Sequence, residues 1–214
     1  MPTITTSEMV PAGAYVSTDN TAAAAGLPVD GVTTTWRTVY RVVAPCPPGD
    51  LFQVHAEASF TNDVGVDPGT RKVVGTRYTV GVGIHLWYYD VDYDGPVALN
   101  DRMVRIGDSE GENVTVDTHH LPLDITRWLA VPDTWPVGHR IAFALRADAH
   151  SSLWKANGGG DVLTVDRLGL IGAQRWTVPA PVVDDPRWQQ LAALETRVAA
   201  LEAAVPSCPP PPPA

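Results

Sequence analysis

Apolar and polar residues alternate along two well-separated stretches in the middle of the chain. In residues 51–60 every second position is apolar, including Phe52, Val54 and Phe60, while the positions between them are mostly polar. Residues 140–147 repeat the pattern with Ile141 and Phe143 on the apolar side. A period of two places successive side chains on opposite faces of a strand, so both stretches predict β-strands with one buried face.

Six further segments resemble strands and are separated by clusters of Gly, Pro, Asp and Asn: residues 36–43, 73–89, 102–106, 113–117, 161–171 and 175–178. About eight strands, with no helical pattern before residue 184, predict an all-β fold, an antiparallel jelly-roll β-sandwich over residues 33–179. The order of the strands stays open. Residues 1–32 show no sustained period and predict an extended N-terminal arm.

A heptad pattern follows the predicted sandwich. Leucine and valine recur at spacings of 3, 4, 3 and 4 from Leu191 to Val205, which predicts a coiled-coil helix over residues 184–205, after which residues 206–214 form a polyproline tail. The predicted oligomerisation residues are Leu191, Leu194, Arg197, Val198, Leu201, Glu202 and Val205. The alternative is an amphipathic helix that packs on its own sandwich.

Composition and charge exclude several classes of function. The net charge is −9 and no cluster of Lys or Arg stands out, so we expect no binding to nucleic acid. No stretch approaches the roughly 20 apolar residues of a membrane span, so we expect no contact with a membrane. The 2 cysteines are too few for a disulfide framework or a thiolate metal site, and no cofactor is expected.

One acidic loop matches part of the calcium-loop pattern. Asp90, Asp92, Asp94 and Asp101 stand at ligand spacings, with Gly95 at the turn position. The same spacing also follows from alternation in a strand, because it places Asp90, Asp92 and Asp94 on one face. A calcium site and a solvated acidic strand end therefore both remain open.

Aromatic residues gather in the same region. Trp87, Tyr88, Tyr89 and Tyr93 form a candidate binding face whose outward rings can stack on a sugar or contact a partner protein. The remaining tryptophans are scattered and are interpreted as core residues: Trp36, Trp128, Trp135, Trp154 and Trp176.

Motifs of catalysis lack the context that they need. Ser109 lies in a Gly-x-Ser-x-Gly string, but predicted strands stand on both sides of it, whereas a nucleophile elbow requires a helix afterwards. The 6 histidines show no ligand spacing typical of a metal site. We therefore predict no catalytic residues and no enzymatic activity.

Two segments resemble parts of trimeric proteins. Residues 197–202 match the short trimerisation motif of parallel three-stranded coiled coils, and residues 157–171 are similar to the closing hairpin of tumour-necrosis-factor-like trimeric jelly rolls found in phage fibres. Basic residues are nearly all Arg, a bias typical of GC-rich genomes such as actinobacteria and their phages.

The resemblance implies a structural virion protein of a tailed phage. On this interpretation a homotrimer of capsid-decoration or head-fibre type, assembled in the host cytoplasm, binds the major capsid protein or another virion protein. The alternative is a tail-associated trimer that binds a receptor or a carbohydrate.

Overall fold

The computed structural model describes residues 9–20, 26–31, 36–67, 69–108, 112–116, 118–153 and 161–177. These residues form ten strands and one short helix: β1 (Val10–Ser17), β2 (Leu27–Asp30), β3 (Arg37–Pro45), β4 (Leu51–Thr61), β5 (Val80–Asp90), α1 (Leu99–Arg102), β6 (Val104–Asp108), β7 (Glu112–Val114), β8 (Leu121–Ala130), β9 (Arg140–His150) and β10 (Val162–Thr177). No helix among them is long and apolar enough to cross a bilayer.

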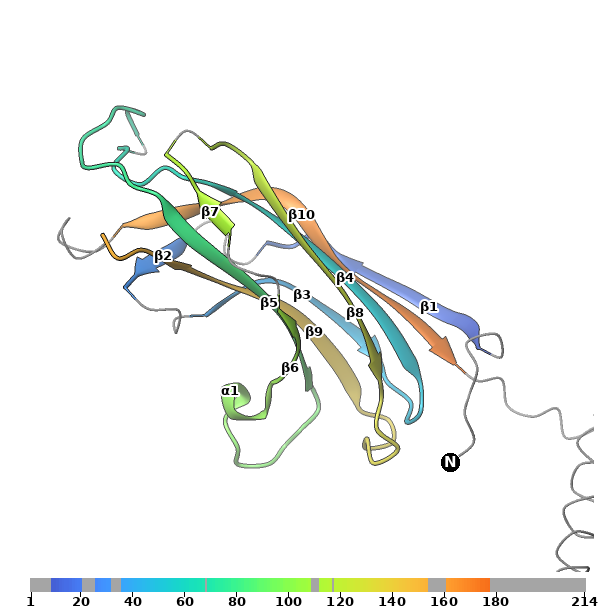
Figure 1. Ribbon diagram of the computed structural model, residues 1–214. Coiled ribbons are helices and arrows are strands. Elements are labelled where there is room, and N and C mark those ends of the chain that lie inside the picture. Colours follow the sequence, from blue (N-terminus) through green and yellow to red (C-terminus); the bar gives the residue numbers. More distant parts are fainter. Residues whose placement is uncertain are drawn as a thin grey trace, which may run out of the picture. The chain divides into compact units, whose positions relative to one another are not determined.

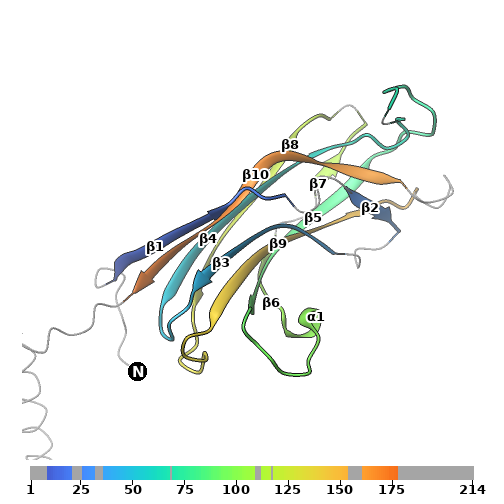
Figure 2. The same cartoon turned by 180° about the vertical axis from the view of Figure 1, so that it is seen from behind.

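The strands form two layers that face each other (Figures 1 and 2). The first layer has the order β1-β10-β4-β8, and the second has the order β3-β9-β5, with β6 and β7 paired to the free side of β5. The short strand β2 links the layers, because it pairs antiparallel with β10 and parallel with β9. The predicted all-β sandwich is confirmed.

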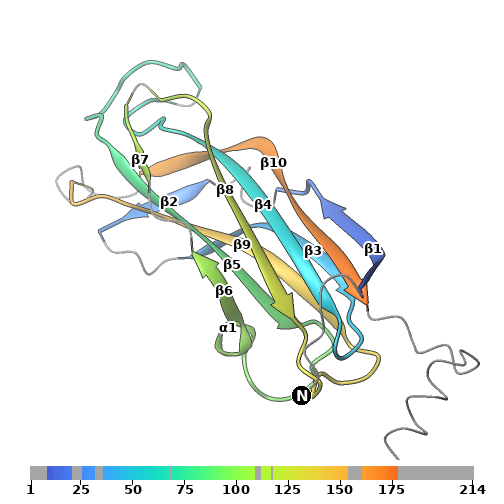
Figure 3. The same ribbon diagram turned by 45° about the vertical axis from the view of Figure 1, so that its right-hand side comes forward.

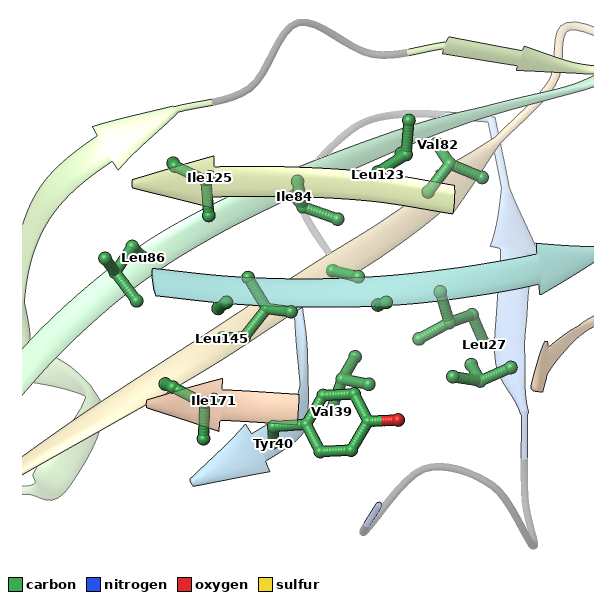
Figure 4. Close-up of a cluster of buried hydrophobic side chains, with 14 of the residues drawn as sticks. Leu27, Val39, Tyr40, Val82, Ile84, Leu86, Leu123, Ile125, Leu145 and Ile171 are labelled. Carbon is green, nitrogen blue, oxygen red and sulfur yellow. The ribbon is translucent and has the colours of Figure 1, made fainter. Parts of the chain in front are cut away.

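The core lies between the layers and explains the alternation in the sequence. The apolar side chains of β4 and β9 point inward, and the rings of Phe52 and Phe143 meet across the core with centroids 5.1 Å apart. Figure 4 shows the same arrangement for Ile125 of β8, Ile171 of β10 and Leu145 of β9. Burial of each large apolar side chain contributes about 1.5–3 kcal/mol, so the core is the main source of stability.

A bulge in β10 separates its two halves. The register with β4 shifts between Val165 and Gly169, and Gly169 has a φ of 141°. A Cβ atom placed on Gly169 would lie 2.5 Å from the backbone oxygen of Glu57 and 2.8 Å from the hydroxyl oxygen of Tyr40. Both the backbone conformation and the close approach of the neighbouring chain therefore require glycine here.

Several predicted boundaries differ from the structure. Part of the predicted arm belongs to the sandwich, since β1 pairs with β10 and β2 joins the layers. Residues 73–79 precede β5 instead of forming its start, and Val73 and Val74 are exposed. Residues 161–178 were expected as two strands, but residues 162–177 are the single strand β10. The structure also adds strand β8 and the one-turn helix α1.

The predicted coiled-coil residues, from Leu191 to Val205, and the polyproline tail lie outside the described residues.

Candidate functional site

A pair of tryptophans lies on the outer face of the first layer. Trp128 of β8 is 51% exposed, which corrects its interpretation as a core residue. Its ring centroid lies 6.4 Å from that of Trp176 on β10, at an interplanar angle of 44°. The pair therefore forms a tilted aromatic surface. β4 separates the strands that carry the two rings.

Polar side chains continue along the same face. Strand alternation places Gln53, His55 and Glu57 of β4 on the side away from the core, beside the outward residues of β8. The Nδ1 atom of His55 lies 2.9 Å from the Oγ1 atom of Thr126, and Glu57 stands directly opposite Asp124. From Gln53 to Ser59 the strand advances roughly 20 Å. We call Gln53, His55, Glu57, Asp124, Thr126, Trp128 and Trp176 the tryptophan face.

A pocket of about 190 Å³ lies at the other end of this face, lined by Glu57, Ala58, Ser59, His120, Pro122, Leu168 and Gly169. Beneath it the buried carboxylate of Asp166 accepts hydrogen bonds from the hydroxyl groups of Ser59 (2.8 Å) and Thr61 (2.9 Å). The Nδ1 atom of His120 lies 3.0 Å from the same carboxylate, and His120 has a φ of 58°. The contact with Asp166 holds the imidazole of His120 at the pocket, and the backbone of His120 has a conformation that non-glycine residues seldom adopt.

This Ser, Asp and His set does not form a catalytic triad. In a triad the imidazole lies between the hydroxyl group and the carboxylate, so that it can take the proton of the nucleophile. Here the hydroxyl group of Ser59 donates directly to Asp166, so no base activates it. Ser109 lies outside the described residues.

The outer face of the second layer is rich in arginine and aromatic side chains. We call Arg41, Trp87, Tyr89, Tyr93, Arg102, Arg105 and Arg146 the arginine face. The guanidinium carbons of Arg146 and Arg105 lie 5.5 and 5.9 Å from the ring centroid of Trp87. Each cation–π contact of this kind contributes about 0.5–1 kcal/mol at an exposed site. The contacts hold the arginines and rings in one arrangement.

The same alternation of cations and rings continues toward the helix α1, which follows β5 on the side away from the first layer (Figure 3). The guanidinium carbon of Arg102 lies 4.7 Å from the ring centroid of Tyr93 and 5.9 Å from that of Tyr89. The guanidinium carbon of Arg41 lies 5.5 Å from the ring centroid of Tyr89. Tyr89 is buried in a small cluster with Ala142 and Ala144.

The predicted aromatic binding face is thus divided between two environments. Tyr88 points toward the core and lies near Trp135, with ring centroids 6.2 Å apart, while Trp87 and Tyr89 lie on the opposite side of β5. Arginines approach the rings of Trp87, Tyr89 and Tyr93, so these rings are less available for stacking on a sugar than Trp128 is.

The four predicted calcium ligands bind side chains of the protein or stand apart. Asp92 accepts hydrogen bonds from the guanidinium group of Arg140, and those bonds lower the pKa of Asp92 to about 2. The Oδ2 atom of Asp90 lies 2.7 Å from the Nδ1 atom of His139. Asp94 is exposed and Asp101 belongs to α1. In the described ranges the structure brings no three His, Cys, Asp or Glu side chains together in a group that could hold a metal ion, and this includes the four predicted ligands.

A buried carboxylate lies beside the arginine face. Asp148 is 2% exposed, its Oδ2 atom lies 3.2 Å from Nδ1 of His150, and its Oδ1 atom has no hydrogen-bond partner within the described part of the chain. Burial raises the pKa of Asp148, because the ionised form loses its hydration. The ring of the neighbouring His85 packs edge-on against the ring of Trp36, with centroids 3.8 Å apart. The Nδ1 atom of His85 lies 2.6 Å from the Oδ1 atom of Asp108.

A second pocket of about 210 Å³ adjoins Cys46. Burial raises the pKa of the Cys46 thiol to about 12, so the thiol stays protonated and is a poor nucleophile at neutral pH. This pocket therefore offers little for covalent chemistry.

The sequence contained a signal for Trp128 that was missed. Leu121, Leu123 and Ile125 alternate as inward residues of β8, which leaves the even positions, including Trp128, pointing outward. For the arginine face the sequence indicated the rings of Trp87, Tyr89 and Tyr93. It gave no signal for Arg146, whose place beside Trp87 depends on the pairing of β5 with β9, strands that are far apart in sequence.

No family model and no curated protein matches the chain. Among solved structures, a Stig cyclase from Fischerella sp. TAU is 13% identical over 68% of this chain and 56% of the cyclase, with a TM-score of 0.27. A structure of carbohydrate-binding modules of the β-sandwich superfamily is 10% identical over 81% of this chain and 58% of that chain, with a TM-score of 0.22. A structure of infectious bursal disease virus, Gt strain, is 10% identical over 88% of this chain and 49% of that chain, with a TM-score of 0.20. The chain thus spans about half the length of these proteins, and with TM-scores this low none of the three carries an argument about its function.

Proposed function

We propose that this chain is a carbohydrate-binding protein, built as a jelly-roll sandwich, that holds a glycan on its tryptophan face. The observation that carries the proposal is the exposed ring of Trp128 beside Trp176, at 6.4 Å between centroids, on an open strand surface. The apolar faces of sugar rings stack on such aromatic surfaces, and aromatic rings are rigid enough to bind at a small entropic cost.

The neighbouring polar groups suit the hydroxyl groups of a sugar. The carboxylates of Glu57 and Asp124 face each other across β4 and β8, and no cation among the described residues pairs with them. Like charges directly opposite each other destabilise a sheet, and hydroxyl groups that donate to both carboxylates would relieve this. The ionised carboxylates accept hydrogen bonds, while the amide of Gln53 both donates and accepts.

The strand order supports the jelly-roll assignment. Successive long strands cross from one layer to the other: β3 lies in the second layer, β4 in the first, β5 in the second, β8 in the first, β9 in the second and β10 in the first. Two interlocked Greek keys produce this alternation.

The test is a glycan array probed with the full chain and with Trp128→Ala. We expect at least a tenfold loss of affinity in the variant, which corresponds to about 1.4 kcal/mol. Val137→Ala is the control, because Val137 is 87% exposed in the turn between β8 and β9 and lines the pocket beside Cys46, which shares no residue with the tryptophan face. If the chain binds no glycan, or if Trp128→Ala binds as well as the wild type, the proposal is wrong.

A second candidate function is that of a homotrimeric virion protein that decorates a capsid. The heptad spacing of Leu191, Val198 and Val205, with Arg197 and Glu202 placed to bridge neighbouring chains, favours it. The test compares the solution mass of the full chain with that of a chain ending at Pro181. A trimer that weakens on truncation supports this function, and a full chain that stays monomeric at micromolar concentration contradicts it.

A further inference from the structure

We propose that the arginine face is the surface through which one copy of this chain binds the acidic surface of a second copy. The proposal is independent of glycan binding, since the arginine face lies on the second layer and the tryptophan face on the first.

The composition of the face is the first argument. Arginine, tryptophan and tyrosine are the residues that dominate the binding energy of protein interfaces, and here they alternate on one side of a sheet. Their positions are fixed in advance, because Trp87 lies within 6 Å of both Arg105 and Arg146. An arranged surface loses less side-chain entropy when a partner binds.

The exposed guanidinium groups provide the second argument. Arg41 and Arg105 are exposed on this face, and carboxylates are the strongest acceptors for arginine.

Charge identifies the partner. In the described ranges Arg105 has an ion pair with Asp108, whereas Arg41, Arg102 and Arg146 have no carboxylate within 4 Å. The whole chain carries a net charge of −9, so a second copy offers carboxylates in excess. A basic patch on an acidic protein is therefore complementary to other copies of the same protein.

The same charges limit the geometry of the contact. Two arginine faces repel each other, so each arginine face must meet a different, acidic surface of the other copy. A two-fold dimer with two reciprocal contacts of this kind and a closed ring of copies both satisfy this condition.

The test is the solution mass of the full chain by sedimentation over a range of concentrations, with Arg41→Glu and Arg146→Glu as variants. Arg167→Glu is the matched control, since Arg167 is exposed on β10 in the first layer. We expect a closed species of at least twice 22.9 kDa. We also expect its dissociation constant to rise at least tenfold in both variants but not in the control, and to rise with added salt.

Circular dichroism establishes that the variants are folded. Arg41→Glu is the safer of the two, because the Arg41 side chain is exposed. The proposal is overturned by a wild-type monomer at tens of micromolar, or by an assembly that both variants leave unchanged. The last result would mean that the heptads alone hold the chains together.

Discussion

Alanine in place of Gly169 is expected to destabilise the sandwich strongly, whereas alanine in place of Gly138 is not. Both glycines have positive φ, 141° for Gly169 and 86° for Gly138, so both substitutions impose a strained backbone on an L-residue. That strain costs about 1–3 kcal/mol. Only Gly169 is also enclosed, with the Glu57 oxygen 2.5 Å from the new Cβ, while no atom lies within 4 Å of a Cβ at Gly138.

The enclosure adds a second cost. Insertion of a methyl group into a closely packed site typically costs about 1–3 kcal/mol, because the neighbours must move, and here one neighbour is the backbone of β4. We therefore expect a loss of about 1–3 kcal/mol for Gly138→Ala and about 2–6 kcal/mol for Gly169→Ala in the free energy of unfolding. Domains of this size are stable by about 5–15 kcal/mol, so the second loss is large but measurable.

Urea unfolding followed by tryptophan fluorescence measures both values on the same chain. The informative quantity is the difference in unfolding free energy between the two variants, because both place a Cβ at a positive φ and only Gly169 is enclosed. If the two alanine variants differ by less than about 0.5 kcal/mol, the bulge of β10 does not bring the backbone of β4 as close to Gly169 as the structure has it.

Three further results are expected. Burial raises the pKa of Asp148 above 3.8, so the stability that protonation of Asp148 contributes is present below that pH and is lost as the pH rises through the folded-state pKa. Over this rise the free energy of unfolding of Asp148→Asn should increase relative to that of the wild type. Urea unfolding at a series of pH values measures this, and it would show no such trend if the carboxylate were solvated. Removal of the hydrogen bonds from Arg140 in Arg140→Gln should raise the pKa of Asp92 from about 2 toward 3.8, and an unchanged value in an NMR titration would exclude the contact. Phe143→Ala should cost about 3–5 kcal/mol in urea unfolding, because the ring is fully buried against Phe52, and a loss below about 1 kcal/mol would place Phe143 outside the core.

Local patterns in the sequence predicted what lies on each face of a strand better than which strands are neighbours. Alternation placed Phe143 and Leu145 in the core and Arg146 on the opposite side, and the structure confirms this assignment. The neighbours of Arg146 depend on pairing: His85 stands opposite it on β5, and the Trp87 ring lies within reach. Such pairing joins residues about 60 positions apart in sequence and leaves no local trace.

The predicted arm illustrates the same limit. Residues 10–17 are small or apolar at nearly every position, without alternation of apolar and polar side chains, so no period marks them as a strand. Their place is determined by hydrogen bonds to β10, which any backbone can make. The Asp166 network beneath the pocket was also out of reach, because Ser59 and Asp166 meet only through the pairing of β4 with β10.

Among the described strands, the first, β1, pairs with the last, β10. Val10 pairs with Thr177 and Ser17 with Ile171, and β10 also separates β1 from β4 within its layer. A ribosome must therefore extend the chain past Thr177 before the first layer can be completed, and until then β1 and one edge of β4 have no partner. Contacts at such long range slow folding, and unpaired edges attract other chains. The yield of folded protein should thus depend on how well chaperones protect the unpaired edges of β1 and β4 until β10 has been synthesised.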